Sequence, residues 1–103
     1  MTRIFVQTII RWRLAFDPDK RMRTLIVRGL DMARANEVFA GPHQIFEDER
    51  HPEELRYITV GWLDGRMIVM VWTQRGDARR IISMRKANER EKARYGGNLD
   101  RPR

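Results

Sequence analysis

Three apolar runs follow one another in the second half of the chain and limit its fold more than any other feature. They read LRYITV (55–60), RMIVMVW (66–72) and ARRIIS (78–83), and they are rich in the β-branched and aromatic residues that favour strands. Asp64-Gly65 lies between the first two runs and Arg75-Gly76-Asp77 between the last two, and both are typical turn sequences. The sequence therefore predicts an antiparallel meander.

The first third of the chain combines a short strand with two helices. Residues Trp12 to Phe16 alternate as a strand does, and Asp17, followed by proline, is typical of a helix start. Gly29 is a natural stop for this helix, Asp31 caps a second one, and Gly41-Pro42 ends it. A short strand over 43–46 and the charged loop EDERHPEE then lead into the three runs.

The last part of the chain is charged and helical. Ser83 is expected to cap a last helix that runs to Tyr95 and stops at Gly96-Gly97. We expect residues 1–103 to form one α+β domain, with an antiparallel sheet of about four strands, two N-terminal helices and a C-terminal helix. Residues 1–11 form an N-terminal extension, either an extra strand, an oligomer contact or a misplaced start, and 96–103 form a loose C-terminal tail.

Several chemistries are excluded by composition. Without cysteine, the chain has no disulfide, thiolate zinc site or cysteine nucleophile. Its two histidines, His43 and His51, lack ligand spacing, so we expect no metal and no cofactor. The N-terminal apolar run is short and interrupted by Gln7, Thr8 and Arg11, which predicts neither a signal peptide nor a spanning helix. We expect a protein of the reducing cytoplasm that does not bind membranes.

Positive charge is unevenly distributed along the chain. Residues 1–43 carry 8 basic and 4 acidic side chains, 44–74 carry 3 and 6, and 75–103 carry 10 and 4, so that +4, −3 and +6 sum to the net +7. Eighteen of the 21 basic residues are Arg, whose planar guanidinium binds phosphate through two hydrogen bonds. The pattern indicates a polyanion such as RNA or an acidic partner, with a solvated Arg-rich face as the alternative.

The direction of side chains along ARRIIS suggests where this charge gathers. Arg80 and Ile82 are expected on one face of the strand, because alternate residues point to opposite sides. Arg79 and Ile81 are expected on the other face. Arg56 begins a neighbouring run, and like charges held together cost free energy unless an anion binds them. A phosphate site is therefore favoured, and edge arginines that prevent aggregation are the alternative.

Five segments in a fixed order identify a family that the chain resembles. They are FDPDK, Gly29, ANEVF, DERHPEELRYITVG and VWTQRGDARRIISMRKANEREKARY, and they span about residues 12–95. In them the chain resembles the BrnT family, ribonuclease toxins of bacterial type II toxin–antitoxin pairs with a RelE-like fold. The most specific matches lie in RIISMRKANEREKARY, at Arg80, Ser83, Arg85, Lys86, Ala87, Glu89 and Tyr95.

The resemblance implies partners as well as a fold. It implies an RNA substrate and a BrnA-like antitoxin with a ribbon-helix-helix part, so that operator DNA is bound only through an autorepressing complex. Whether the free protein is also a homodimer is left open.

The chain departs from the family pattern at the end of the first helix. The family usually has an Asn and then Lys-His-Gly there, whereas this chain has Thr24, Val27, Arg28 and Gly29. Only the glycine matches, so no role of that Lys or His in cleavage is carried over. The alanine of the family's RIISAR-type run is Met84 here, which is a packing change.

Metal-free RNA cleavage needs charge stabilisation and two proton transfers. Arginines suit the first task, and His51 suits the second because imidazole exchanges a proton near neutral pH, although a solvated turn is the alternative for His51. Glu49, Lys20 and Lys86 are the other acid–base candidates, and core packing is the alternative role of Trp62. The predicted catalytic residues are Arg56, Arg75, Arg80, Arg85 and His51, and the predicted RNA-binding residues are Lys20, Lys86, Arg79 and Trp62.

Two functions are compatible with these features. The first is a metal-independent endoribonuclease toxin that an antitoxin neutralises by covering the basic face. The second is a non-catalytic nucleic-acid-binding or antitoxin-binding module, a degenerate toxin in a repressor complex, which the missing Lys-His pair favours. Both predict binding that weakens steeply with salt, and only the first predicts cut RNA.

Overall fold

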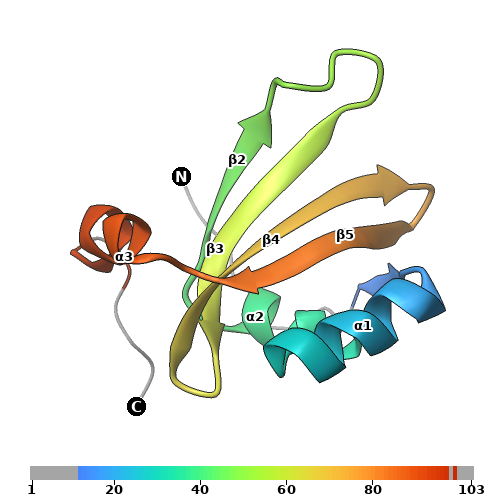
Figure 1. Ribbon diagram of the computed structural model, residues 1–103. Coiled ribbons are helices and arrows are strands. Elements are labelled where there is room, and N and C mark those ends of the chain that lie inside the picture. Colours follow the sequence, from blue (N-terminus) through green and yellow to red (C-terminus); the bar gives the residue numbers. More distant parts are fainter. Residues whose placement is uncertain (1–11, 98, 100–103) are drawn as a thin grey trace.

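The computed structural model describes residues 12–97 and 99, and its centre is a five-stranded sheet (Figure 1). The strand order is β1-β5-β4-β3-β2, in which β1 is parallel to β5 and all other neighbours are antiparallel. The predicted α+β class is confirmed, with one strand more than the four expected. The elements are β1 (Arg13–Ala15), α1 (Pro18–Arg28), the 3₁₀ helix η1 (Met32–Arg34), α2 (Ala35–Ala40), β2 (Gln44–Asp48), β3 (Arg56–Leu63), β4 (Arg66–Arg75), β5 (Ala78–Lys86) and α3 (Glu89–Gly96).

The hairpins of the meander form at the turns that the sequence predicts. Asp64 and Gly65 have φ angles of 53° and 75°, the left-handed conformations that a two-residue turn between β3 and β4 requires. Gly76, with a φ of 60°, reverses the chain between β4 and β5. The parallel pairing of β1 with β5 is possible because the helices and three strands lie between them in the chain.

Apolar side chains pack on both faces of the sheet. On one side, the helix face, Met32 of η1 and Val38 of α2 belong to the same buried cluster as Met70 of β4. On the other side, the open face, Tyr95 of α3 packs on a smaller cluster that includes Val60. Because α3 lies at one end of the sheet (Figure 1), much of the open face remains accessible.

Polar caps define the first helices. Asp17 accepts a hydrogen bond of 2.9 Å from the backbone N–H of Asp19 at the start of α1, and Gly29, with a φ of 69°, ends that helix as predicted. Asp31 caps η1, which then continues into α2. Gly41 ends α2, as expected.

The prediction that Ser83 caps the last helix is wrong. Ser83 lies opposite Val71 within β5, and the strand continues to Lys86. Pairing with β4 satisfies the backbone there, so no helix can begin. The cap of α3 is Asn88, which accepts a 2.8 Å hydrogen bond from the N–H of Glu91, while the Glu91 carboxylate accepts 2.9 Å from the N–H of Asn88.

One extra residue interrupts the pairing of β5 with β4. Trp72 lies opposite Ile81, but Val71 lies opposite Ser83, which leaves Ile82 with no residue across the ladder. This is a β-bulge, in which two residues of one strand oppose one residue of the other.

The bulge changes which side chains share a face. Arg79 lies on the helix face and Arg80 on the open face, so the two arginines point to opposite faces, as predicted. The alternation predicted through Ile82 ends there, because Ile82 lies beside α1 instead. Beyond it, Ser83 and Arg85 lie on the open face with Arg80. Without the extra residue, Arg85 would point to the helix face.

Helix α1 lies against β5 yet has no buried residue. Met22, Ile26 and Val27 are 56%, 74% and 78% exposed. None of the helices in the described part of the chain is long and apolar enough to cross a bilayer. Of the predicted tail over 96–103, Leu99 is buried in the smaller cluster; the predicted extension over 1–11 lies outside the described residues.

Gly61→Ala tests how tightly α2 approaches the sheet. A Cβ at Gly61 would lie 2.6 Å from Val38 Cγ1 and 3.2 Å from His43 Cβ, and Val38 is fully buried, so it cannot move aside. We expect the free energy of unfolding to fall by about 1–3 kcal/mol in urea denaturation. Gly41→Ala is the matched control, because its Cβ would have no heavy atom closer than 3.9 Å; equal losses in both variants would contradict this packing.

Glu91→Gln tests the anchor of α3. Both guanidinium ends of Arg85 donate to Glu91 at 2.8 Å, and these bonds lower the pKa of Glu91 to about 2. The ionised carboxylate of Glu91 therefore stabilises the fold fully at pH values above the ordinary titration range of a glutamate. This contribution is lost as the pH falls through about 2. We expect Glu91→Gln to cost about 1–2 kcal/mol at pH 7 and almost nothing at pH 2, measured by hydrogen exchange of the α3 amides.

The control for this experiment is Glu89→Gln in the same helix. The Glu89 side chain is 91% exposed, and within 12–97 and 99 it binds only Lys92, at 3.2 Å. Its removal should therefore leave α3 protection nearly unchanged at both pH values. A pH-independent loss in Glu91→Gln would show that the capping geometry, and not the charge, anchors the helix.

Candidate functional site

Polar side chains form a row across four strands of the open face. Asp48 of β2 lies opposite Arg56 of β3. Thr73 of β4 lies opposite both Arg56 and Arg80, its neighbours on β3 and β5. Opposed residues of antiparallel strands have Cα atoms about 5 Å apart, so two steps place Arg56 and Arg80 roughly 10 Å apart. Two arginine side chains at this spacing can reach one anion between them.

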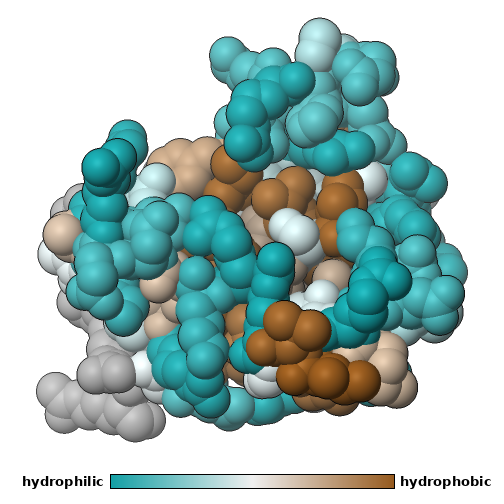
Figure 2. All heavy atoms as spheres, in the orientation of Figure 1, coloured by the Kyte–Doolittle hydropathy of each residue, from teal (hydrophilic) through white to brown (hydrophobic). Residues whose placement is uncertain are grey.

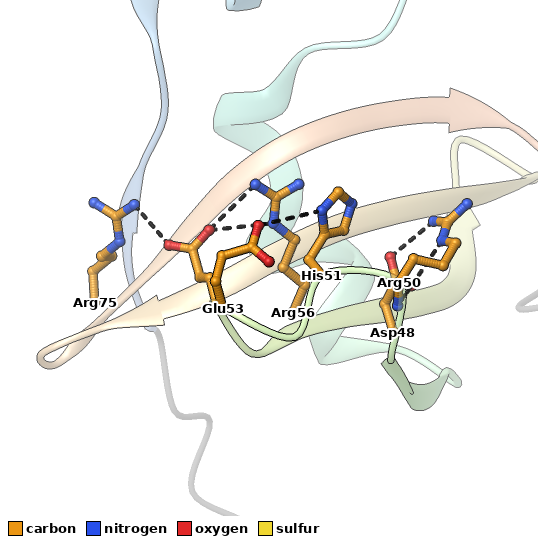
Figure 3. Close-up of polar contacts among 7 residues, drawn as sticks. Asp48, Arg50, His51, Glu53, Arg56 and Arg75 are labelled. Carbon is orange, nitrogen blue, oxygen red and sulfur yellow. Dashed lines mark hydrogen bonds and ion pairs between the residues drawn. The ribbon is translucent and has the colours of Figure 1, made fainter.

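Glu54 holds two arginines in place beside this row. They are Arg56 and Arg75, both labelled in Figure 3. Its Oε1 accepts a hydrogen bond of 3.2 Å from Arg56 Nε, and its Oε2 accepts one of 3.0 Å from Arg75 Nη2. The bond from Arg75, followed by the one from Arg56, keeps the pKa of Glu54 below its ordinary value. Glu54 is therefore ionised and a poor proton acceptor, and its function is to orient the two arginines.

The loop between β2 and β3 is fixed over the row by hydrogen bonds. Thr73 Oγ1 donates to the backbone oxygen of Leu55 at 2.7 Å. The buried Asp48 binds Arg50 through both carboxylate oxygens, each at 2.8 Å, which lowers the pKa of Asp48 to about 2. Arg50 is thus directed outward on a rigid base, with 72% of its side chain exposed.

Arg85 lies on the open face near the C-terminal end of β5, opposite Val69 of β4. Its hydrogen bonds to Glu91 raise the pKa of Arg85, and the positive charge of Arg50 acts in the opposite direction. This repulsion places the two guanidinium groups within electrostatic range of each other. Arg80 lies on β5 opposite Thr73 and is half-buried. Its side chain makes no hydrogen bond or ion pair with any residue of 12–97 or 99.

His51 lies in the same loop and faces the solvent. Its side chain is 38% exposed, and its Nδ1 is 4.0 Å from Glu53 Oε2, too far for a hydrogen bond (Figure 3). A bound substrate could therefore reach the imidazole without breaking a contact.

The floor of the open face beside the row is apolar. Phe46, Ile58 and Val71 lie opposite one another on β2, β3 and β4, and all three are partly or largely exposed. Figure 2 shows this apolar surface in brown, surrounded by hydrophilic side chains in teal. The face thus combines a floor on which bases can rest with a rim that can bind phosphates.

Arg79 lies apart from this site. Its guanidinium carbon is 4.0 Å from the ring centre of Trp12, 4.1 Å from that of Phe39 and 4.4 Å from that of Trp72, all on the helix face. Burial there lowers the pKa of Arg79. These cation–π contacts join β1, α2 and the sheet, which gives Arg79 a structural role and leaves RNA binding by it a prediction.

The structure thus brings together the five predicted catalytic residues around one face and separates the predicted RNA-binding ones. Lys20 lies on α1, Lys86 ends β5, and Trp62 packs near the β3–β4 turn against the smaller cluster. The residues that the sequence did not single out are Asp48, Arg50 and Glu54. Glu54 and Arg56 are two positions apart, as are Asp48 and Arg50, and this spacing next to strand ends was the available signal.

Such a site can bind a phosphodiester and stabilise additional negative charge on it. Arg80 contributes an uncompensated charge, and Arg50, Arg56 and Arg85 contribute guanidinium groups positioned by carboxylates. Among the residues that the structure describes, no three histidine or carboxylate side chains form a metal-binding group.

Comparison with known proteins identifies the family of the chain. A family model described as "Ribonuclease toxin, BrnT, of type II toxin-antitoxin system" matches residues 16–91, which include all the arginines of the site. No curated protein and no solved structure matches the chain significantly. With most of its length matched, the chain belongs to the BrnT family of ribonuclease toxins.

Proposed function

We propose that this toxin cleaves single-stranded RNA on the open face, without a metal ion, by attack of the 2′-hydroxyl. The observation that carries the proposal is the row of Arg56, Thr73 and Arg80, with the arginines in register on β3 and β5 and the fixed loop beside them. Backbone hydrogen bonds set their spacing before the substrate arrives. Preorganised positive charge of this kind is the largest contribution to many phosphoryl-transfer and acyl-transfer reactions.

Bond exchange at phosphorus needs a nucleophile from the RNA and positive charge from the protein. The 2′-oxygen attacks the adjacent phosphorus and the bond to the 5′-oxygen breaks, which leaves a 2′,3′-cyclic phosphate and a 5′-hydroxyl. Arg80 and Arg85 bind the non-bridging oxygens, whose charge grows in the phosphorane. Arg56, oriented by Glu54, contacts the phosphate from the opposite strand, and Arg75 extends the same contact. DNA lacks the nucleophile and is not cut.

His51 is the proposed proton-transfer group. It removes the proton of the 2′-hydroxyl as a base, and the imidazolium formed in this way gives that proton to the departing 5′-oxygen. Its support is position: the exposed imidazole lies in the loop that also carries Arg50 and Glu54. Glu54 is excluded from this role by its lowered pKa, and Glu49 and Lys86 remain the alternatives.

The cognate antitoxin of this type II toxin acts, in our proposal, by covering the open face. Exposed apolar side chains such as Phe46, 38% exposed, beside arginines form a surface that an acidic protein segment can cover. We propose a BrnA-like antitoxin with a ribbon-helix-helix part, through which the complex binds operator DNA.

Arg80→Gln tests the proposed reaction. Incubated with single-stranded RNA in chelator, the wild-type protein should release fragments ending in 2′,3′-cyclic phosphate. The variant should be slower by about 10²- to 10³-fold, because one preorganised donor to the phosphorane is lost. Products are separated on denaturing gels and their ends identified by mass spectrometry.

Arg34→Gln is the matched control for charge. Arg34 belongs to η1 on the helix side of the sheet and pairs with Glu37 and Asp64, away from the open face, so its loss should leave the rate unchanged. Intact RNA with the wild-type protein under every condition, or equal rates for Arg80→Gln and Arg34→Gln, would end the proposal.

His51→Gln tests the proton-transfer role. We expect kcat to fall by about 10²-fold and the pH–rate profile to lose its limb near neutrality. His43→Gln is the control, since His43 Nδ1 lies 2.8 Å from the backbone oxygen of Gly41, remote from the loop. If His51→Gln keeps the wild-type pH profile, another residue carries out the proton transfer.

A further inference from the structure

Three hollows lie end to end across the C-terminal end of β5. The first, of about 290 Å³, lies between α1 and β5 and is lined by Lys20, Arg23, Val27, Arg28 and Ile82, among others. The second, of about 350 Å³, is lined by Val27, Arg28, Arg85 and Lys86. The third, of about 270 Å³, lies between α3 and the β3–β4 turn and is lined by Trp62, Arg66, Met67, Lys86 and Lys92, among others.

Shared lining residues place the three hollows next to one another in one row. Val27 and Arg28 line both the first and the second hollow, and Lys86 lines both the second and the third. Figure 1 shows the end of β5 passing between α1 and α3, which form the two ends of this path. We call it the β5 groove. It meets the candidate site at Arg85.

The lining of the β5 groove is basic throughout. Seven cationic side chains line it and no carboxylate does. The side chains of Lys20, Arg23 and Lys86 make no hydrogen bond or ion pair with any described residue. Like charges gathered along one channel repel each other unless a polyanion neutralises them. The seven are Lys20, Arg23, Arg28, Arg66, Arg85, Lys86 and Lys92.

Arg28 fixes the junction of the first two hollows. Its Nη1 donates to the backbone oxygen of Met84 at 2.9 Å, which ties the end of α1 to β5. The other N–H groups of this guanidinium remain available to a ligand.

The far hollow has a different character. Trp62 and Met67 provide apolar walls, with Arg66, Lys86 and Lys92 around them. A π-face bordered by cations suits a nucleobase, which stacks while its neighbouring phosphates are neutralised.

We propose that the β5 groove binds the RNA strand beyond the cleaved phosphodiester, with phosphates along the cations from Arg23 to Lys86 and a base against Trp62. This inference rests on the proposed ribonuclease function and names the form of its substrate: an unpaired strand several nucleotides long, bound without sequence readout. An acidic protein segment is the competing occupant, and the continuous line of cations favours the polymer with regularly spaced charges.

The test measures binding apart from chemistry. Fluorescence anisotropy with 2′-O-methyl RNA, which has no free nucleophile, compares oligonucleotides of about 4 and about 12 nucleotides. Arg23→Gln and Lys86→Gln should each weaken binding of the longer strand by about five- to tenfold and reduce the salt slope by about 0.7. Arg23→Gln should leave the shorter strand unaffected. Arg13→Gln, outside the groove, should leave both unchanged.

Two results would overturn the inference. One is that Arg23→Gln and Lys86→Gln bind the longer RNA as Arg13→Gln does. The other is that these variants weaken binding of a poly-glutamate peptide and not of RNA, which would assign the groove to a protein. RNA that is bound in a groove-dependent way and never cut would remove the proposed catalysis and keep the groove. RNA that is cut normally by variants that bind like the control would remove the groove alone.

Discussion

The register shift between β4 and β5 is the constraint on which the site depends. Trp72 lies opposite Ile81 and Val71 opposite Ser83, so Ile82 adds one residue to β5. Upstream of it, Arg79 is enclosed by aromatic rings and helps to close the core. Downstream of it, Arg85 faces the open side with Arg80. A single strand thereby supplies both the enclosed Arg79 and the arginines of the candidate site, and the one extra residue of the bulge decides the face on which Arg85 lies.

Carboxylates then convert a surplus of arginine into an ordered site. Glu54, Asp48 and Glu91 each bind one or two guanidinium groups through short hydrogen bonds, and each has a lowered pKa as a result. A flexible arginine loses rotamer freedom when it binds an anion, and these carboxylates impose that loss during folding. Arg80 has no such partner among the described residues, and its half-buried position on β5 restricts it instead.

Local chemistry in the sequence predicted most of the fold. Asp17 and Gly29 mark the ends of α1, and Asp64-Gly65 marks a hairpin, because each requirement is met within a few residues. The prediction at Ser83 failed because a serine favours a helix start through local hydrogen bonds, whereas the pairing with β4 that holds Ser83 in a strand involves residues distant in the sequence. The β-bulge was not predicted, because two consecutive isoleucines, Ile81 and Ile82, give no sign of which residue is the extra one.

Folding order follows from the parallel pairing of β1 with β5. Arg13 and Ala78 are partners, although 65 positions separate them, and no strand between them in the chain can substitute for either. Synthesis proceeds from the N-terminus, so β1 and α1 emerge with their edge of the sheet still missing, and the strand bearing Arg80 and Arg85 arrives last among the five. The arginines of the candidate site therefore reach their final positions only after the last strand has been synthesised and the sheet has closed.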